Sequence, residues 1–313
     1  MTNTTHAVPI HTLTTHSLIT KAGHSITARV FESIGENKGV VIIAPATGVA
    51  QYLYDDFAIW LTEQQFTAIT FDYEGIGLSV NRHVKYSKSD KLSWATHDCA
   101  AVLDFAEQNY PDQKRTWIGH SVGGHMLGMM DNTDRIDQAI TVAAGTGTWW
   151  FNAPPTRRIA WLFWYFIVPV AVPLYGYFPG KKLRFMCDMP KGVVMQWRRW
   201  CLKRDYAVGY EGEWLRQRFA RVTMPITALQ FSDDEMMSAR NIEMLHQFFT
   251  QAPQTRLEIK PSDVGQKRIG HIGWHRARYR VLWEKYILNA LQTDTEINTK
   301  SHLTANNHCS GTA

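Results

Sequence analysis

The sequence predicts an α/β protein with a mostly parallel sheet and helices on both of its faces. Residues 39–44 (Gly-Val-Val-Ile-Ile-Ala) form an apolar run rich in β-branched residues, which is typical of a strand buried on both faces. Further short runs alternate with segments of helical spacing, and that alternation indicates a parallel sheet. Residues 116–125 then join an apolar strand to a helix through a Gly-x-Ser-x-Gly turn.

The first half of the chain supplies most of the expected sheet. Residues 16–31 alternate enough to form two antiparallel strands, with a turn at residues 21–24. The strands expected next are residues 39–44, 66–71, 115–119 and 139–143. The helices expected between them are residues 55–65, 96–110 with Thr96 as the N-cap, and 122–130. Sites in such sheets form at the carboxyl ends of strands, where Ser121 and the loop 45–48 both fall.

The alternating pattern stops after residue 144 and resumes near residue 222. The intervening segment is basic and unusually aromatic, with Trp149, Trp150, Trp161, Trp164, Trp197, Trp200 and Trp214. Beyond it we expect strands at residues 225–231 and 255–259 and helices at residues 238–250 and 274–291. The sequence therefore predicts a core made of residues 1–144 and 222–291, an insertion at 145–221, and a disordered polar tail at 292–313.

Composition narrows the class of protein. Of 313 residues, 45% are apolar and 19% are charged, which is typical of a globular chain. The net charge of +5 is mild, and no dense run of lysine and arginine indicates a nucleic-acid partner. The four cysteines lie far apart, which fits a reduced compartment better than a set of disulfides; they are Cys99, Cys187, Cys201 and Cys309. Residues 1–15 lack the pattern of a secretory signal. The expected location is the cytoplasm.

The sequence gives no reason to expect a metal or a cofactor. His120 and His125 flank the serine, but their spacing does not stack them on one helical face, and no His-Glu-x-x-His is present. Gly75-Ile76-Gly77 lacks the third glycine of a dinucleotide fingerprint, and residues 145–148 (Gly-Thr-Gly-Thr) lack the lysine of a phosphate loop.

Ser121 is the candidate nucleophile. A tight strand-to-helix turn pushes the serine hydroxyl out of the sheet, and its close backbone approach explains the glycines at positions 119 and 123. The N–H of Val122, at the start of the following helix, can stabilise an oxyanion. The pentapeptide alone is also compatible with a passive serine in a glycine-rich turn.

The order of these pieces resembles the α/β-hydrolase fold over about residues 17–291. Residues 72–79 (Asp-Tyr-Glu-Gly-Ile-Gly-Leu-Ser) look like the family's Asp-x-Arg-Gly-x-Gly-x-Ser loop, with Glu74 where arginine is usual. Ala-Pro-Ala-Thr-Gly at 44–48 and Ile-Gly-His-Ile-Gly at 269–273 look like a narrower bacterial group of predicted hydrolases. The resemblance implies serine-dependent hydrolysis of esters, thioesters or amides, although fold alone does not give function.

The resemblance implies a histidine base and an acid after the insertion. The base is expected at His271, between two glycines, with His275 as the alternative. The acid is expected at Asp234, just after the strand 225–231, with Asp233 as its competitor. The acidic cluster could also be a solvated helix start.

The second oxyanion donor is expected from the loop after Ala44. Proline has no N–H, so Pro45 cannot donate. Ala46 is the first choice and Thr47 the alternative, and Gly48 lets the loop turn towards Ser121.

The insertion is expected to be an aromatic helical cap over the nucleophile. Residues 159–179 carry no charge and approach the length of a membrane span, about 20 residues. Pro169, Pro173 and Gly176 are expected to interrupt the helix, and a span would separate strands of one sheet. We therefore expect a soluble cap that lines an apolar pocket, with basic neighbours available for a carboxylate, a phosphate or peripheral contact with an anionic membrane surface.

The expected function is cleavage of an ester or thioester with an apolar group, through an acyl-enzyme on Ser121 and without a cofactor. Acyl transfer to an alcohol or thiol uses the same residues and stays open. A non-catalytic binding protein that keeps the fold is the alternative from another class. The sequence does not identify the substrate or the oligomeric state.

Overall fold

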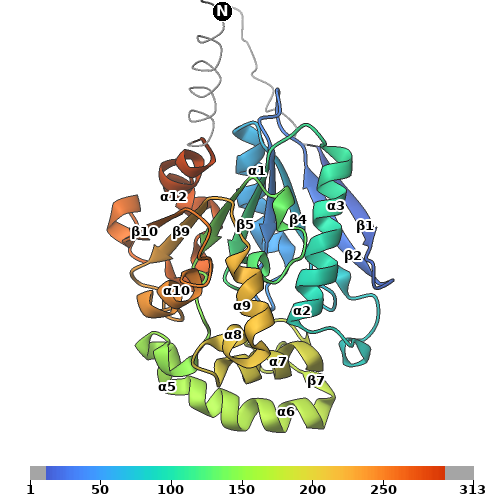
Figure 1. Cartoon of the computed structure of the whole chain (residues 1–313), viewed down its shortest axis with the longest axis vertical. Helices are drawn as coiled ribbons and strands as arrows, with labels where there is room; N and C mark the ends of the chain where they lie inside the picture. The colour runs from blue at the N-terminus through green and yellow to red at the C-terminus, as the bar shows by residue number, and fades with distance from the viewer. Residues whose placement is uncertain (1–11, 293–313) are drawn as a thin grey trace, which may run out of the picture.

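A central eight-stranded sheet organises the molecule (Figure 1). The structure is a computed structural model that describes residues 12–292. The strands are β1 Leu13–Ile19, β2 Ser25–Phe31, β3 Val40–Ala44, β4 Thr67–Phe71, β5 Arg115–His120, β6 Gln138–Val142, β9 Ile226–Phe231 and β10 Gln254–Ile259. Their spatial order is β1-β2-β4-β3-β5-β6-β9-β10. Antiparallel pairing is limited to β1 with β2 and β2 with β4, so the predicted mostly parallel sheet is confirmed.

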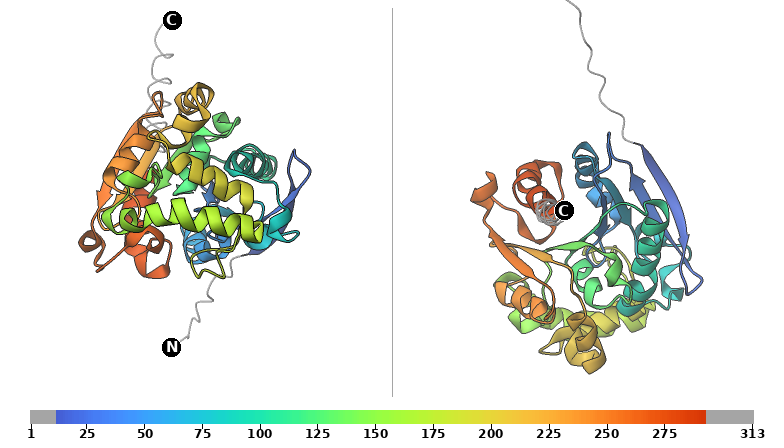
Figure 2. Two further views of the ribbon diagram at one scale, coloured as in Figure 1. Left: turned by 90° about the horizontal axis from the view of Figure 1, so that it is seen from below. Right: turned by 45° about the horizontal axis from the view of Figure 1, so that its top comes forward.

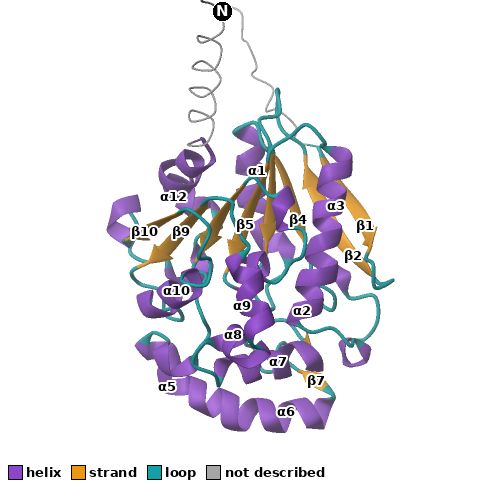
Figure 3. Ribbon diagram, viewed as in Figure 1, coloured by secondary structure: helices purple, strands orange, loops and turns teal. Residues whose placement is uncertain are grey.

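Both faces of the sheet are covered by helices (Figure 3). Strand β3 is buried along its whole length: Val40 and Ile42 belong to one apolar cluster, and Val41 and Ile43 to the other. The first cluster includes α3 (Ala100–Asn109), and the second includes α1 (Asp55–Glu63) and the C-terminal helical turns. Period-two alternation of a strand sends successive side chains to opposite faces, which explains the two cores.

The helix expected at residues 96–110 begins earlier than the sequence analysis predicts. It starts with α2 (Lys91–Ser93), continues through a π-helical segment, Trp94–Cys99, and ends as α3. Asp90 is the N-cap, because its carboxylate accepts from the Ser93 N–H at 2.8 Å while Ser93 Oγ binds the Asp90 N–H. The Thr96 hydroxyl instead donates to the Leu92 carbonyl within the helix, so its assignment as N-cap is wrong.

The last helix also differs from the expectation of a continuous helix over residues 274–291. A short helix, α11 (Gly270–Gly273), is followed by the 3₁₀ turn Ala277–Tyr279, α12 (Arg280–Leu282) and the π-helical segment Trp283–Leu288. The other core helices are α4 (Val122–His125), which passes into the 3₁₀ turn Met126–Gly128, and α10 (Ala239–His246) with Ser238 as its N-cap. The expected disordered tail, beyond Gln292, lies outside the described residues.

The insertion forms a layer of helices at one end of the sheet, as Figures 1 and 2 show. Its elements are α5 (Pro154–Leu162), the π-helical segment Phe163–Ile167, α6 (Val168–Tyr175), β7 (Tyr177–Phe178), β8 (Met189–Pro190), α7 (Lys191–Cys201), α8 (Tyr206–Glu211) and α9 (Glu213–Ala220). We call this layer the cap. Ala160, Trp164, Val168 and Val172 bury one face of its long helix.

The expected interruption of the long cap helix by prolines is wrong. Residues from Pro154 to Tyr175 form one continuous helix that is long and apolar enough, by length and composition, to cross a membrane. The wider π turn before α6 accommodates the missing N–H of Pro169, and Pro173 lies within α6. Gly176, with φ +78°, ends the helix. In the sequence the helix falls between β6 and β9, and these two strands pair with each other in one sheet.

Candidate active site

The turn after β5 holds Ser121 in a strained conformation. Ser121 has φ +52° and ψ −114°, outside the regions that ordinary residues adopt. A Cβ on Gly119 would collide with the backbone of Gly123 and Gly124, and one on Gly123 would collide with the carbonyl of Ala44. The Ser121 N–H donates to the Val142 carbonyl at 2.9 Å, which ties the turn to β6. Backbone crowding thus holds the serine at the carboxyl edge of the sheet.

Asp234 and His271 form a buried hydrogen-bonded pair. His271 Nδ1 donates to Asp234 Oδ2 at 2.8 Å, and both side chains are almost fully buried. The other carboxylate oxygen accepts from the N–H groups of Met236 and Met237 at 2.7 and 2.8 Å. Because an ionised carboxylate only accepts, Nδ1 carries the proton and Nε2 is left as the basic nitrogen.

The two other acidic residues of this cluster shape the histidine loop. The Oδ2 of Asp233 accepts hydrogen bonds from the backbone N–H of Ile269 at 2.8 Å and from that of Gly270 at 3.2 Å. Glu235 Oε2 accepts from the His271 N–H at 3.1 Å. Of the two acids that the sequence left open, Asp234 is therefore the one in contact with the imidazole, while Asp233 binds the backbone beside it.

Ser121 and His271 both line one cavity of about 380 Å³. In the described part of the chain, no hydrogen bond joins Ser121 Oγ to the imidazole. Such contacts are often long before substrate binds and tighten in the complex. The alternative base, His275, is not among the described residues that line this cavity. Its ring lies 4.8 Å from that of Tyr54, and burial lowers its pKa to about 4.

Residues of the loop after β3 line the same cavity. The Ala46 N–H already donates to Tyr54 Oη at 3.1 Å, and that hydroxyl also bonds His120 Nδ1 at 2.7 Å. The Thr47 N–H, which was the alternative, has no acceptor among the described residues. Val122, Ala46 and Thr47 all line the cavity. The Ala46 N–H is therefore already engaged, whereas the Thr47 N–H is left without a partner among the described residues.

His120 has a structural role that the sequence analysis missed. Its Nε2–H donates to the His271 carbonyl at 3.0 Å, while Nδ1 accepts from Tyr54 Oη. Burial, together with nearby His271 and His275, holds the pKa of His120 well below its usual value. A neutral His120 thus joins the serine turn to the histidine loop. The described residues contain no group of three or more His, Cys, Asp or Glu side chains that could hold a metal.

The cavity is mostly apolar and adjoins a second cavity in the cap. The second cavity, about 340 Å³, shares four wall residues with the first: Phe185, Trp197, Met236 and Met237. Its other walls include Ile159, Phe163, Trp164 and Phe178 of the cap. The sequence analysis did not single out Lys91, Tyr206 or Tyr52, whose side chains also line the first cavity. Nothing in the local sequence distinguishes this lysine from the exposed lysines beside it.

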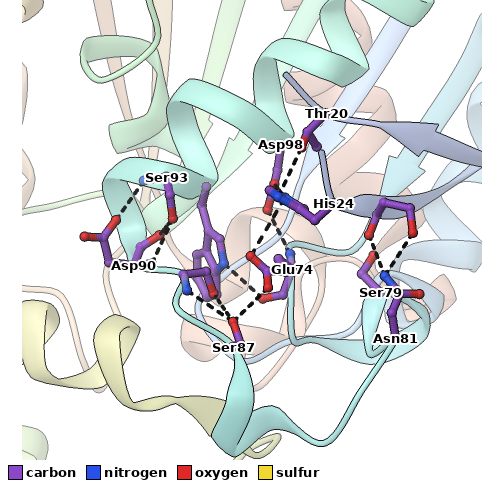
Figure 4. A network of polar contacts seen from close by, with 12 residues as sticks. Thr20, His24, Glu74, Ser79, Asn81, Ser87, Asp90, Ser93 and Asp98 are labelled. Carbon is purple, nitrogen blue, oxygen red and sulfur yellow. Dashed lines mark hydrogen bonds and ion pairs between the residues drawn. The ribbon is translucent and has the colours of Figure 1, made fainter. Parts of the chain in front are cut away.

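The glutamate in place of the family's arginine belongs to a separate polar network (Figure 4). The Glu74 carboxylate accepts a hydrogen bond from Ser87 Oγ at 2.9 Å, and the backbone N–H of Glu74 donates to Asp98 Oδ2 at 2.8 Å. His24 Nε2 lies 2.6 Å from Asp98 Oδ1 and 3.8 Å from Glu74 Oε2. A histidine thus provides the positive partner here, and the network joins the β1–β2 turn to the loop after β4.

Comparisons with known proteins agree with this architecture. A model of a family described as serine aminopeptidase, S33, matches residues 35–263. A comparison with curated protein sequences finds no significant match.

Three solved structures illustrate the likeness of fold. The esterase domain of a Rhodothermus marinus protein is 14% identical, with 90% of this chain and 98% of that chain covered and a TM-score of 0.57. The α/β hydrolase GrgF from Penicillium sp. sh18 is 15% identical, with coverage of 90% and 98% and a TM-score of 0.59. A thermostable carboxyl esterase from Bacillus coagulans is 12% identical, with coverage of 79% and 90% and a TM-score of 0.57.

The family match spans well over half of the chain, and the likeness to solved structures covers 90% of it. The chain belongs to the serine aminopeptidase S33 family of serine hydrolases and has the α/β-hydrolase fold.

Proposed function

We propose that this protein cleaves carboxylic esters, or thioesters, of a substrate with an apolar group, through an acyl-enzyme on Ser121. The observation that carries the proposal is the cavity that Ser121 and His271 both line, with apolar walls that continue into the cap. The esterases of similar fold support the same chemistry by analogy.

The reaction has two steps in this proposal. His271 Nε2 takes the Ser121 proton as Oγ attacks the substrate carbonyl, and Asp234 stabilises the imidazolium. The N–H groups of Val122 and Thr47 hold the oxyanion, with Ala46 as the alternative donor. His271 then protonates the leaving alcohol or thiol, and in the second step it activates water to release the acid. No cofactor takes part.

The charge of the cavity favours an ester over a peptide with a free amino terminus. Recognition of an ammonium group requires an acidic side chain or a ring of oxygen acceptors near the nucleophile. Among the described residues that line the cavity, none is acidic, and one is Lys91. An aminopeptidase substrate would therefore place its positive charge against a lysine in an apolar site.

The test is hydrolysis of 4-nitrophenyl esters from acetate to dodecanoate by the wild type and Ser121→Ala. We expect turnover to rise with chain length and to fall on the order of 10⁴-fold or more in the variant. A fluorophosphonate probe should label the wild type and not the variant. Wild-type rates in purified Ser121→Ala, or a preference for acetate with no gain from longer chains, would contradict the proposal.

Two other functions are outcomes of the same experiment. Added alcohol or thiol acceptors that divert most of the acyl group into a new ester or thioester would indicate a transferase. Absence of both labelling and turnover would indicate a binding protein that keeps the fold.

We also propose that the cap contacts an anionic membrane surface through its long helix. The helix exposes a row of large apolar side chains: Ile159, Trp161, Leu162, Tyr165, Phe166, Val170 and Leu174. Only 22% of its most apolar window is buried. From residue 145 to residue 187 there is no acidic residue, whereas five exposed basic residues lie in the first turns of the helix or just after its end: Arg157, Arg158, Lys181, Lys182 and Arg184. This combination fits a helix that lies in the membrane interface.

Sedimentation with phosphatidylserine-containing vesicles tests the membrane proposal. Leu174 is 72% exposed, so Leu174→Glu should weaken binding without affecting the fold. Val281→Glu is the matched control, because Val281 is also exposed but lies on α12, away from the cap (Figure 1). Equal binding by both variants, or no binding by the wild type, would refute the contact.

A further inference from the structure

Lys91 is a buried lysine in the wall of the catalytic cavity. It is the first residue of α2, only 1% of its surface is exposed, and it lines the cavity together with Ser121 and His271. Transfer of an ammonium group from water to an apolar site is strongly unfavourable unless an opposite charge or hydrogen bonds compensate. The surroundings of Lys91 therefore indicate what its amine can bind.

The side chain of Lys91 has one oxygen partner and two aromatic neighbours. Its Nζ donates to Thr47 Oγ1 at 2.9 Å. The same nitrogen lies 4.2 Å from the centre of the Trp197 ring and 6.0 Å from that of Trp200. No carboxylate of the described residues forms an ion pair with it. An ammonium has three N–H donors, so two remain for a ligand in the cavity.

The backbone holds this lysine in a fixed position. The Lys91 N–H donates to Gln196 Oε1 at 2.7 Å, which joins α2 to α7 of the cap. The capping box of Asp90 and Ser93 closes the first turn of the helix. A charged group held between the core and the cap can recognise a substrate without losing much conformational entropy on binding.

We propose that Lys91 binds a carboxylate carried by the substrate, so that the preferred ester combines an apolar body with a free acid group. The inference rests on the proposed esterase function and specifies its substrate class. A carboxylate would accept from the free Nζ donors and supply the negative charge that the cavity wall lacks. The apolar walls shared by the two cavities would hold the chain between the ester and the acid.

The protonation of Lys91 gives the proposal a pH signature. Burial lowers the pKa of Lys91 to about 7. The titratable groups near it are Cys201 of α7, whose pKa is raised by burial, His125 of α4, whose pKa is lowered to about 3, and Tyr206 of α8, whose pKa is raised. These three are uncharged near neutrality. The Glu211 carboxylate of α8 accepts a hydrogen bond from Trp200 Nε1 at 2.8 Å. Of these groups the amine alone should therefore change charge in this range, and His271, which also lines the cavity, acts equally on esters with and without the acid.

The experiment compares matched esters with and without the acid. The probes are the 4-nitrophenyl half-esters of adipic, suberic and sebacic acid, each paired with the ester of the monoacid of equal length. The readout is the ratio of kcat/KM within each pair for the wild type, Lys91→Met and Lys88→Met. Methionine preserves length and apolar packing. Lys88 is an exposed lysine on the same segment and serves as the control.

We expect the half-ester to be preferred at one of these chain lengths, and the preference to fall about 10- to 100-fold in Lys91→Met, as loss of a hydrogen bond to a charged group implies. Lys88→Met should keep the wild-type ratio. The wild-type preference should also decline as the pH rises through about 7, because kcat/KM reports the free enzyme and the amine loses its proton there.

The outcomes separate this inference from the esterase proposal. If the monoacid esters are hydrolysed but the ratio is equal in the wild type and Lys91→Met, carboxylate recognition is refuted and the esterase stands. If Lys91→Met lowers both members of each pair equally, Lys91 supports the Thr47 loop and does not bind an acid. If no ester is hydrolysed by the wild type, the esterase proposal itself fails.

Discussion

The pair of adjacent acids after β9 offers the sharpest test of the active-site geometry. Asp234 and Asp233 differ by one position in sequence, yet only Asp234 contacts the imidazole of His271, at 2.8 Å. Asp234→Asn keeps the shape of the side chain and removes its charge. Asp233→Asn makes the same chemical change at a carboxylate whose hydrogen-bond partners, among residues 12–292, are the backbone N–H groups of Ile269 and Gly270.

The structure allows the size of the effect to be estimated. A carboxylate and an imidazolium with charge centres about 4 Å apart interact by about 4 kcal/mol at the effective dielectric constant of a protein site. Since about 1.4 kcal/mol corresponds to tenfold in rate, loss of this term slows acylation about 10³-fold. An asparagine amide can also hold the ring in the wrong tautomer, which extends the loss to about 10⁴-fold. The Asp234→Asn variant should therefore lose about 10³- to 10⁴-fold in kcat.

Asp233→Asn should behave differently. Its remaining carbonyl oxygen can still accept from one of the two N–H groups, so we expect a stability loss of about 1 kcal/mol and less than about tenfold in kcat. The assay is steady-state hydrolysis of a medium-chain 4-nitrophenyl ester, with thermal unfolding of both variants as the control. Equal losses of kcat in the two variants, or near wild-type turnover by folded Asp234→Asn, would refute the assignment of Asp234.

Two further predictions concern the serine turn and the polar network. Gly119→Ala should destabilise the protein by about 3 kcal/mol or more, because its Cβ would collide with backbone atoms of Gly123 that cannot move aside; an unchanged urea midpoint would contradict the crowding argument. The pKa of His24 is raised above 6.5, and the largest cause is its hydrogen bond to Asp98. Its stabilising contribution is therefore complete below about pH 6.5 and is lost as the pH rises through the folded-state pKa. His24→Gln should therefore lower the urea midpoint more at about pH 6 than at about pH 9, and equal losses at both would show that the ion pair contributes nothing.

The local sequence determined the strands of the sheet and the crowded turn that carries Ser121. A β-branched apolar run such as residues 40–43 favours a strand with both faces buried, and the glycines at 119 and 123 indicate a turn too crowded for a Cβ. These features depend on neighbours within a few positions, which is why composition and spacing were enough. Two local predictions were wrong. The structure has Asp90 in place of Thr96 as N-cap, and its cap helix continues through Pro169 and Pro173. A capping box and a π turn decide these features, and neither follows from the hydrophobic period.

Tertiary structure alone decided which side chains meet. Asp234 rather than Asp233 contacts His271, and the Ala46 amide is taken by Tyr54, because strand ends and loops far apart in sequence converge at one edge of the sheet. The same convergence buries Lys91 between the core and the cap, which no property of its neighbours in sequence could indicate. Residue type and spacing thus specified the chemistry that is available. The choice among equivalent groups depended on distances of a few ångströms, and those exist only after the chain has packed.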